Sequence, residues 1–154
     1  MKIFDSRILI TLCCTLALSA CSGEPDDSRP GQPVAHRRQL FKQFTRTLEP
    51  MGMVARERKD FNRSEFLASA QELQQLARQP WPYFTPDSNY PPTHAKADVW
   101  LKVGDFQQAQ ESFQAKTNEL ATMAQSGNAE QLRAAVNNVE RSCKSCHKQF
   151  RNDS

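Results

Sequence analysis

The chain has 154 residues, 38% of them hydrophobic and 24% charged, and its 20 Lys and Arg against 17 Asp and Glu give a formal net charge of +3. This length suits a single domain, and the weak, dispersed positive charge excludes an electrostatic footprint for nucleic acid. The 5 glycines and the few β-branched residues argue against a β-rich fold. Five cysteines fall into two clusters at opposite ends of the sequence, unlike the even spread of a disulfide scaffold.

The first 20 residues have the form of a secretory signal peptide. A positively charged start precedes an apolar run of 13 residues from Ile8 to Ala20. This run is shorter than the roughly 20 residues of a transmembrane helix, so a permanent membrane span is the weaker interpretation. The sequence Leu18-Ser19-Ala20-Cys21 resembles the lipobox of bacterial lipoproteins, which predicts lipidation of Cys21 and attachment to a membrane. An ordinary cleavage site followed by a chance cysteine is the alternative.

Residues 22–32 are polar and rich in Pro, Gly, Ser and Asp, a composition typical of a flexible tether. Ser22 stands where Asp signals inner-membrane retention in the lipoproteins that this segment resembles, which favours anchoring to the outer membrane and a periplasmic location. The predicted organisation is therefore a lipoprotein signal peptide over 1–20, a lipidated cysteine and tether over 21–32, and a folded domain over 33–154.

Apolar residues at alternating three- and four-residue steps predict two helices in the first half of this domain, over 35–58 and from 62 to just before Pro80. Asn62 with Glu65 has the form of a capping box, and Phe61 with Phe66 that of a hydrophobic staple. The next segment, 80–92, holds five prolines and predicts a loop rich in aromatic residues.

Two further helices are predicted over 95–126 and 128–150. The apolar stripe of the first of these helices includes Val99, Val103 and Phe106. Asn128 with Gln131 forms a capping box at the start of the second. Short connections within each pair imply antiparallel neighbours. The predicted fold is all-α, an up-down-up-down four-helix bundle.

The second cysteine cluster, Cys143-Lys144-Ser145-Cys146-His147, matches the C-x-x-C-H attachment motif of c-type haem. Each thiol can add to one vinyl group of the porphyrin, and the adjacent imidazole can bind the iron as the proximal ligand. The motif predicts one covalent haem c near the C-terminus, bound by Cys143 and Cys146 with His147 as the axial ligand. Export agrees, because haem of this type is attached outside the cytoplasm.

Three other interpretations of the motif stay open. A thioredoxin-like dithiol would need a βαβ setting that the helical pattern does not offer. Structural zinc would need a fourth ligand, for which His36 and His94 remain. A disulfide between residues three apart is possible but contributes little loop-closure entropy.

A C-x-x-C-H motif almost at the end of a helical bundle resembles class II cytochrome c, the cytochrome c′ family. The segment from Leu132 to Arg151 is similar to the family's final helix, in which an Arg four residues after the haem His lies on the proximal face; here this is Arg151. Pro80-Trp81 with Phe84 matches the loop after the second helix, and Val99-Trp100 matches the third helix. The resemblance places Trp81 and Trp100 in the haem pocket.

The resemblance also places Arg37 and Phe41 at the family's positions for an Arg and for the apolar residue over the distal face of the iron. Met51 and Met53 lie ten and twelve residues beyond Phe41, roughly 15 to 18 Å along a helix, out of reach of the iron. Some members carry a coordinating Met where this chain has Phe41. The resemblance therefore implies five-coordinate haem that binds small gases such as nitric oxide and carbon monoxide.

The alternative is a six-coordinate electron-transfer cytochrome in which His36 binds the iron, whereas His94 is expected at the surface. A third possibility is a helical lipoprotein with a structural C-x-x-C and no haem. Enzymatic turnover is not expected, because no nucleophile–base pair or acid pair accompanies the haem.

Several cations are predicted to cluster at the haem end of the bundle: Arg38, Lys42, Arg141, Lys144 and Lys148. A basic rim could steer an acidic periplasmic redox partner, although solvated surface charge is the simpler interpretation. Relatives of the family often form dimers through the first two helices, so a homodimer is a further expectation.

Overall fold

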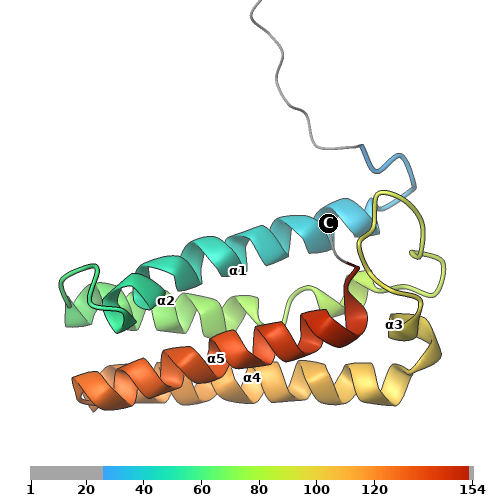
Figure 1. Ribbon diagram of the computed structural model, residues 1–154. Coiled ribbons are helices and arrows are strands. Elements are labelled where there is room, and N and C mark those ends of the chain that lie inside the picture. The colour runs from blue at the N-terminus through green and yellow to red at the C-terminus, as the bar shows by residue number, and fades with distance from the viewer. Residues whose placement is uncertain (1–25, 153–154) are drawn as a thin grey trace, which may run out of the picture.

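A computed structural model describes residues 26–152, and the signal peptide and Cys21 lie outside this range. Four long helices form an antiparallel up-down-up-down bundle (Figure 1), which confirms the predicted fold class. They are α1 (Pro33–Ala55), α2 (Arg63–Leu76), α4 (Val103–Ser126) and α5 (Ala129–Phe150). The short helices η1 (Trp81–Tyr83) and α3 (Asp98–Leu101) belong to the connection between α2 and α4. Within residues 26–152, no helix is both long enough and apolar enough to cross a membrane.

The bundle core consists of the predicted apolar stripes. Leu73 of α2, Leu120 of α4 and Val136 of α5 are fully buried in it. Both predicted helix starts are present. Asn62 accepts a hydrogen bond from the Glu65 backbone N–H at 3.2 Å, and Asn128 forms a complete capping box with Gln131. These local signals fix where α2 and α5 begin, and the start of α5 sets which residues share its buried face.

The prediction of one continuous third helix is wrong, because the helix is interrupted at Lys102. Lys102 has φ −117° and ψ 56°, so α3 ends at Leu101 and α4 starts afresh at Val103. The break turns the predicted stripe residue Val103 to solvent, where it is 62% exposed, while Val99 and Phe106 stay buried. A single turn of α3 therefore belongs to the end of the bundle rather than to its long third helix.

The predicted tether also needs correction at its C-terminal end. Asp27 is 3% exposed, and its Oδ2 accepts hydrogen bonds from the backbone N–H groups of Val34 at 2.8 Å and Ala35 at 3.1 Å. It thus satisfies the first turn of α1, which has no side-chain cap from Gln32. Tyr90 donates its hydroxyl to Asp27 Oδ1 at 2.7 Å. The folded domain therefore includes Asp27.

Candidate haem site

The C-x-x-C-H residues lie on the last turns of α5. Steps of three and four residues keep Cys143, Cys146 and His147 on one side of the helix. All three line one cavity of about 490 Å³ between α1, α4 and α5, here called the side cavity. Its other walls include four aromatic or aliphatic side chains from α1 and α4, namely Phe41, Phe44, Leu48 and Phe113.

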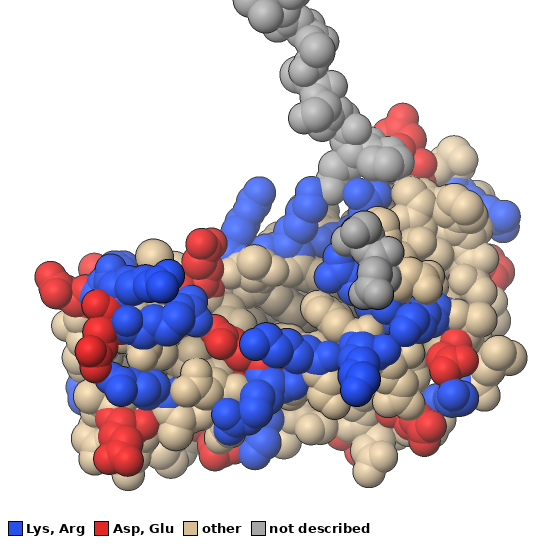
Figure 2. Space-filling model, viewed as in Figure 1, with Lys and Arg blue, Asp and Glu red and all other residues tan. Residues whose placement is uncertain are grey.

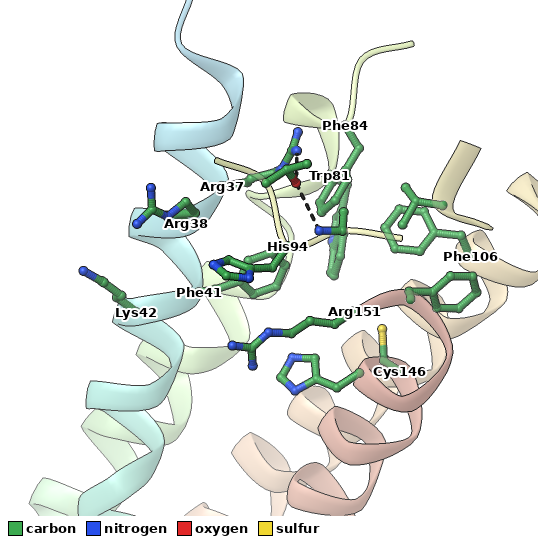
Figure 3. A pocket seen from close by; sticks show the side chains of 15 residues that line it. Arg37, Arg38, Phe41, Lys42, Trp81, Phe84, His94, Phe106, Cys146 and Arg151 are labelled. Carbon is green, nitrogen blue, oxygen red and sulfur yellow. Dashed lines mark hydrogen bonds between the residues drawn. The ribbon is translucent and has the colours of Figure 1, made fainter. Parts of the chain in front are cut away.

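A second cavity of about 300 Å³, the end cavity, lies under the loop of residues 77–97 that joins α2 to α3 (Figure 3). It shares Phe41, Trp81, Cys146 and His147 with the side cavity. The two cavities therefore adjoin across these four side chains, and each volume falls within or near the roughly 300–1,000 Å³ of typical ligand sites. Met51 and Met53 line neither of them, as their distance along α1 predicts.

Phe41 enters this region from α1, across from Cys146 on α5 (Figure 3). Its ring packs edge-on against Phe44, Trp81 and Phe84, with centroids 5.3, 6.1 and 6.3 Å away. These contacts fix its position in the shared wall. A phenyl ring offers neither a metal ligand nor a strong hydrogen-bond donor.

Arg37 lines the end cavity as predicted, but its guanidinium is engaged with the 77–97 loop. It is 3% exposed. Nη1 donates to Tyr83 O at 2.9 Å and Ser88 Oγ at 2.8 Å, and Nη2 donates to Ser88 O at 2.9 Å and Thr93 Oγ1 at 2.7 Å. Burial lowers the pKa of Arg37. Arg37 thus holds the loop that roofs the cavity, a role that the sequence did not reveal.

Trp81 and Trp100 were both expected in the pocket, and the structure separates them. Trp81 lines both cavities, and its indole N–H donates to Ala77 O at 2.7 Å. Trp100 lines neither. Its indole N–H donates to Thr85 O at 2.8 Å, and its ring packs on Phe84 at 6.3 Å. Trp100 of the α3 turn therefore supports the loop from behind, outside both cavities, and its place in the haem pocket stays a prediction.

The structure places the two histidines His36 and His94 on different sides of the 77–97 loop. His36 stacks on Tyr83 at 4.8 Å and lines a separate groove between α1 and the start of the loop. His94, expected at the surface, is exposed but lines the end cavity, and Figure 3 shows its ring pointing inward from the loop. Its carbonyl accepts a hydrogen bond from the Asn152 N–H at 2.8 Å. Sequence spacing could not reveal this orientation, because a proline-rich loop has no periodic face.

The two cavities differ in charge. Among the described residues, the end cavity is lined by four cations and no carboxylate: Arg37, Arg38, Lys42 and Arg151. The side cavity is instead lined by charges of both signs. These are Glu49, Lys144 and an ion pair in which Arg56 Nη1 lies 2.8 Å from Glu140 Oε1. The end cavity therefore suits the carboxylate end of a ligand, whereas the aromatic walls that the two cavities share suit an apolar part of that ligand.

The protonation of the motif residues distinguishes among its interpretations. Burial, with Cys146 and Glu140 nearby, raises the pKa of Cys143 to about 11, and burial raises the pKa of Cys146. Redox-active dithiols depend instead on a lowered thiol pKa. Burial and the charge of Arg151 lower the pKa of His147, which keeps its imidazole neutral and able to bind a metal.

The remaining alternatives also lack support within residues 26–152. Cys143 and Cys146 are free thiols rather than a disulfide. No group of three or more His, Cys, Asp or Glu side chains in this range is placed to hold a metal ion such as zinc. Two thiols, a neutral imidazole, an aromatic wall and a basic end together fit a haem bound through its vinyl groups and iron.

Comparison with known proteins agrees with this geometry. Residues 32–151 match the family model described as Cytochrome C'. Over 134 residues the chain is 30% identical to cytochrome c′ of Halomonas halodenitrificans, covering 83% of this chain and 98% of that protein. Over 124 residues it is 27% identical to cytochrome c′ of Alcaligenes xylosoxydans, covering 80% and 96%.

Solved structures show the same fold. A nitric oxide complex of a variant of the Alcaligenes xylosoxidans protein superposes with a TM-score of 0.77 at 26% identity, covering 83% of this chain and all of that one. A carbon monoxide complex of another variant gives the same TM-score, identity and coverage. Members of this family carry covalently bound haem c. The chain belongs to the cytochrome c′ family.

Proposed function

We propose that this chain is a periplasmic c-type cytochrome whose five-coordinate haem iron binds nitric oxide and carbon monoxide. Cys143 and Cys146 form the thioether bonds and His147 is the axial ligand. When bound, the haem supplies an iron that takes up a gas molecule on its open face and changes oxidation state by one electron. The residues of the chain hold the porphyrin, exclude water and leave the distal face without a protein ligand.

Phe41 is the observation that carries this proposal. It lies across the cavity from α5 and is fixed there by Phe44, Trp81 and Phe84. A small neutral gas can bind beside this phenyl ring, which itself offers bound oxygen no hydrogen-bond donor. The nitric oxide and carbon monoxide complexes of the Alcaligenes xylosoxidans variants support the same ligand class.

His147 and Arg151 act together on the opposite side of the proposed site. Burial and the Arg151 charge lower the pKa of His147, so its imidazole is neutral at the pH of the periplasm. Arg151 lines the end cavity with His147. It is therefore placed to bind a haem carboxylate or to stabilise negative charge near the proximal ligand.

An absorption spectrum of the purified reduced protein, with and without carbon monoxide, tests this function. We expect a high-spin, five-coordinate spectrum that changes on addition of either gas. A low-spin, six-coordinate spectrum in both oxidation states contradicts the proposal. Retention of haem on a denaturing gel, and its loss in Cys143→Ser/Cys146→Ser, tests the covalent attachment separately.

Six-coordinate haem is the second candidate, and we propose His94 rather than His36 as its sixth ligand. His94 lines the end cavity with His147, whereas His36 is stacked on Tyr83 outside it. If His94 binds the iron, the protein is an electron carrier with a low-spin spectrum. His94→Ala then converts that spectrum to high spin, while the matched His36→Ala variant leaves it unchanged.

We also propose that Cys21 is lipidated and anchors the protein to the outer membrane. The support for this anchoring is the lipobox-like sequence before Cys21. Fractionation of cells tests it: the wild-type protein should sediment with membranes, and Cys21→Ala should release it into the soluble periplasm.

A periplasmic redox partner and a homodimer also belong to the proposal, and sedimentation of the purified protein tests the dimer.

A further inference from the structure

A line of cations follows the exposed side of the last turns of α5. Arg141, Lys144 and Lys148 are spaced by three and four residues, which places them along one side of α5, and Arg151 follows directly after the helix ends at Phe150. All four are exposed. The sequence from 141 to 152 contains no Asp or Glu. We call these four residues the basic stripe.

The basic stripe borders the proposed haem site. Lys144 lines the side cavity and Arg151 lines the end cavity, and both cavities also include Cys146. Figure 2 shows Lys and Arg side chains gathered around the hollow in this face of the molecule. The stripe therefore lies beside the two thiols, Cys143 and Cys146, that would hold the porphyrin.

The charges of the stripe are not neutralised by neighbours within residues 26–152. Lys144, Lys148 and Arg151 form no ion pair with a residue in this range, and Arg141 donates to the neutral amide of Asn138. Elsewhere on the bundle several cations do have carboxylate partners: Arg56, Lys59, Lys102, Lys116 and Arg133. Attraction to the C-terminal end of the helix dipole explains cations in the last turn but not Arg141 and Lys144, which lie earlier.

We infer that the basic stripe is the docking surface for an acidic redox protein, and this inference rests on the proposed haem site. A haem held by Cys143, Cys146 and His147 would supply one electron as its iron passes from ferrous to ferric, and the partner's own redox centre would accept that electron. Complementary charge would bring the partner's acidic face to the haem edge and raise the rate of encounter. An electron-transfer partner needs only a short-lived complex, which a polar surface suits.

An anionic membrane is the less suitable occupant. Helices that lie on membranes bury apolar side chains beneath their cations. Here the exposed residues between the cations include Ser145 and Gln149, while Phe150 is 4% exposed and packs into the bundle. The stripe thus carries charge without an apolar group to insert.

The test compares two charge reversals of equal size in the holoprotein. Arg141→Glu/Lys148→Glu alters the stripe outside the haem motif, and Arg58→Glu/Arg78→Glu, at two exposed arginines elsewhere on the surface, is the matched control. Stopped-flow spectroscopy follows oxidation of the reduced haem by hexacyanoferrate(III) and by a blue-copper protein with an acidic surface. We expect the stripe variant to react about tenfold more slowly with both at low ionic strength, and this difference to shrink with added salt.

A cationic oxidant, tris(phenanthroline)cobalt(III), should instead react faster with the stripe variant. Redox-inert hexacyanochromate(III) provides a readout without electron transfer. In the reduced carbon monoxide complex of the wild type, whose haem would be diamagnetic, it should broaden backbone NMR signals of residues 141–151. Equal slowing in the control variant, or broadening centred elsewhere, overturns the inference. The inference is also overturned if the protein, made without its N-terminal 25 residues, binds phosphatidylglycerol vesicles and the stripe variant does not. Covalent haem is measured in every sample, so failure of the haem proposal is seen separately.

Discussion

Arg37 and Thr93 are joined by a 2.7 Å hydrogen bond from Nη2 to Oγ1, which connects the first turns of α1 to the loop above the haem site. The next residue, His94, lines the end cavity, and its carbonyl accepts a hydrogen bond from the backbone N–H of Asn152, just beyond α5. The loop is thus held from both α1 and the C-terminal segment. These two attachments set the shape of the cavity wall between them.

Replacing Arg37 by Met should destabilise the protein strongly. The substitution removes four hydrogen bonds and leaves the oxygens of Tyr83, Ser88 and Thr93 without this donor in a buried place. Since each buried unsatisfied group costs about 1–3 kcal/mol, we expect the free energy of unfolding to fall by about 3 kcal/mol or more. Urea denaturation of the holoprotein measures it. The exposed Arg46→Met on the same helix is the control, and equal losses in the two variants would contradict the role given to Arg37.

Replacing Phe41 by Met should convert the haem from five- to six-coordinate. Phe41 lies in the wall shared by both cavities, across from α5, so a thioether at this position is directed toward the site of the iron. We expect a low-spin spectrum and weaker binding of carbon monoxide, both measured by absorption. Leu40→Met adds the same group to a neighbouring position that lines neither cavity and should leave the spectrum high-spin. An unchanged spectrum in Phe41→Met would mean that Phe41 does not face the iron.

The parts of the structure that local sequence determines were predictable. The capping box at Asn128 and the apolar stripe through Val136 and Val139 fix the start and buried face of α5, and these place Cys143, Cys146 and His147 on one side. The register of α1 likewise follows from its apolar spacing, which puts Phe41 in the cavity wall. Helix periodicity therefore predicted which of these side chains share a face of their helix.

The parts that depend on long-range contacts were not predictable. His94 and Trp100 take their orientations from a loop held by Arg37, more than 50 residues earlier in the chain, and by the C-terminal segment. Asp27 had the composition of a tether, but its contacts with the α1 backbone and Tyr90 bury it. Neither spacing nor composition carries information about such partners.

Asp27 should make stability depend on acid pH. Burial alone would raise its pKa, but hydrogen bonds from Tyr90, Ala35, Arg29 and Val34 outweigh this and lower it below the ordinary value of 3.8. Because the folded-state pKa lies below the unfolded one, the ionised carboxylate contributes stability above about pH 4, and this contribution is lost as the pH falls through the folded-state value.

Asp27→Asn should therefore unfold more readily than the wild type near neutral pH, and the gap between them should narrow as the pH falls below about 4. Urea unfolding measured at a series of pH values gives both quantities. The exposed Asp60→Asn serves as the control. A gap that stays constant with pH would show that Asp27 stabilises the fold by its shape and hydrogen bonding alone, without its charge.

Removing the haem should leave the bundle much less stable. The two cavities, about 300 and 490 Å³, lie between α1 and α5 and are lined by Phe41, Trp81 and Phe113 among others, so the porphyrin would fill space that the side chains do not. A group bound only by the folded state stabilises that state, and an unfilled cavity loses packing contacts. We expect Cys143→Ala/Cys146→Ala to melt at least about 10 °C below the holoprotein in circular dichroism. Ser145→Ala, within the same motif, should keep both haem and melting temperature. Unchanged melting in the double variant would mean that the helices pack to full stability without the cofactor.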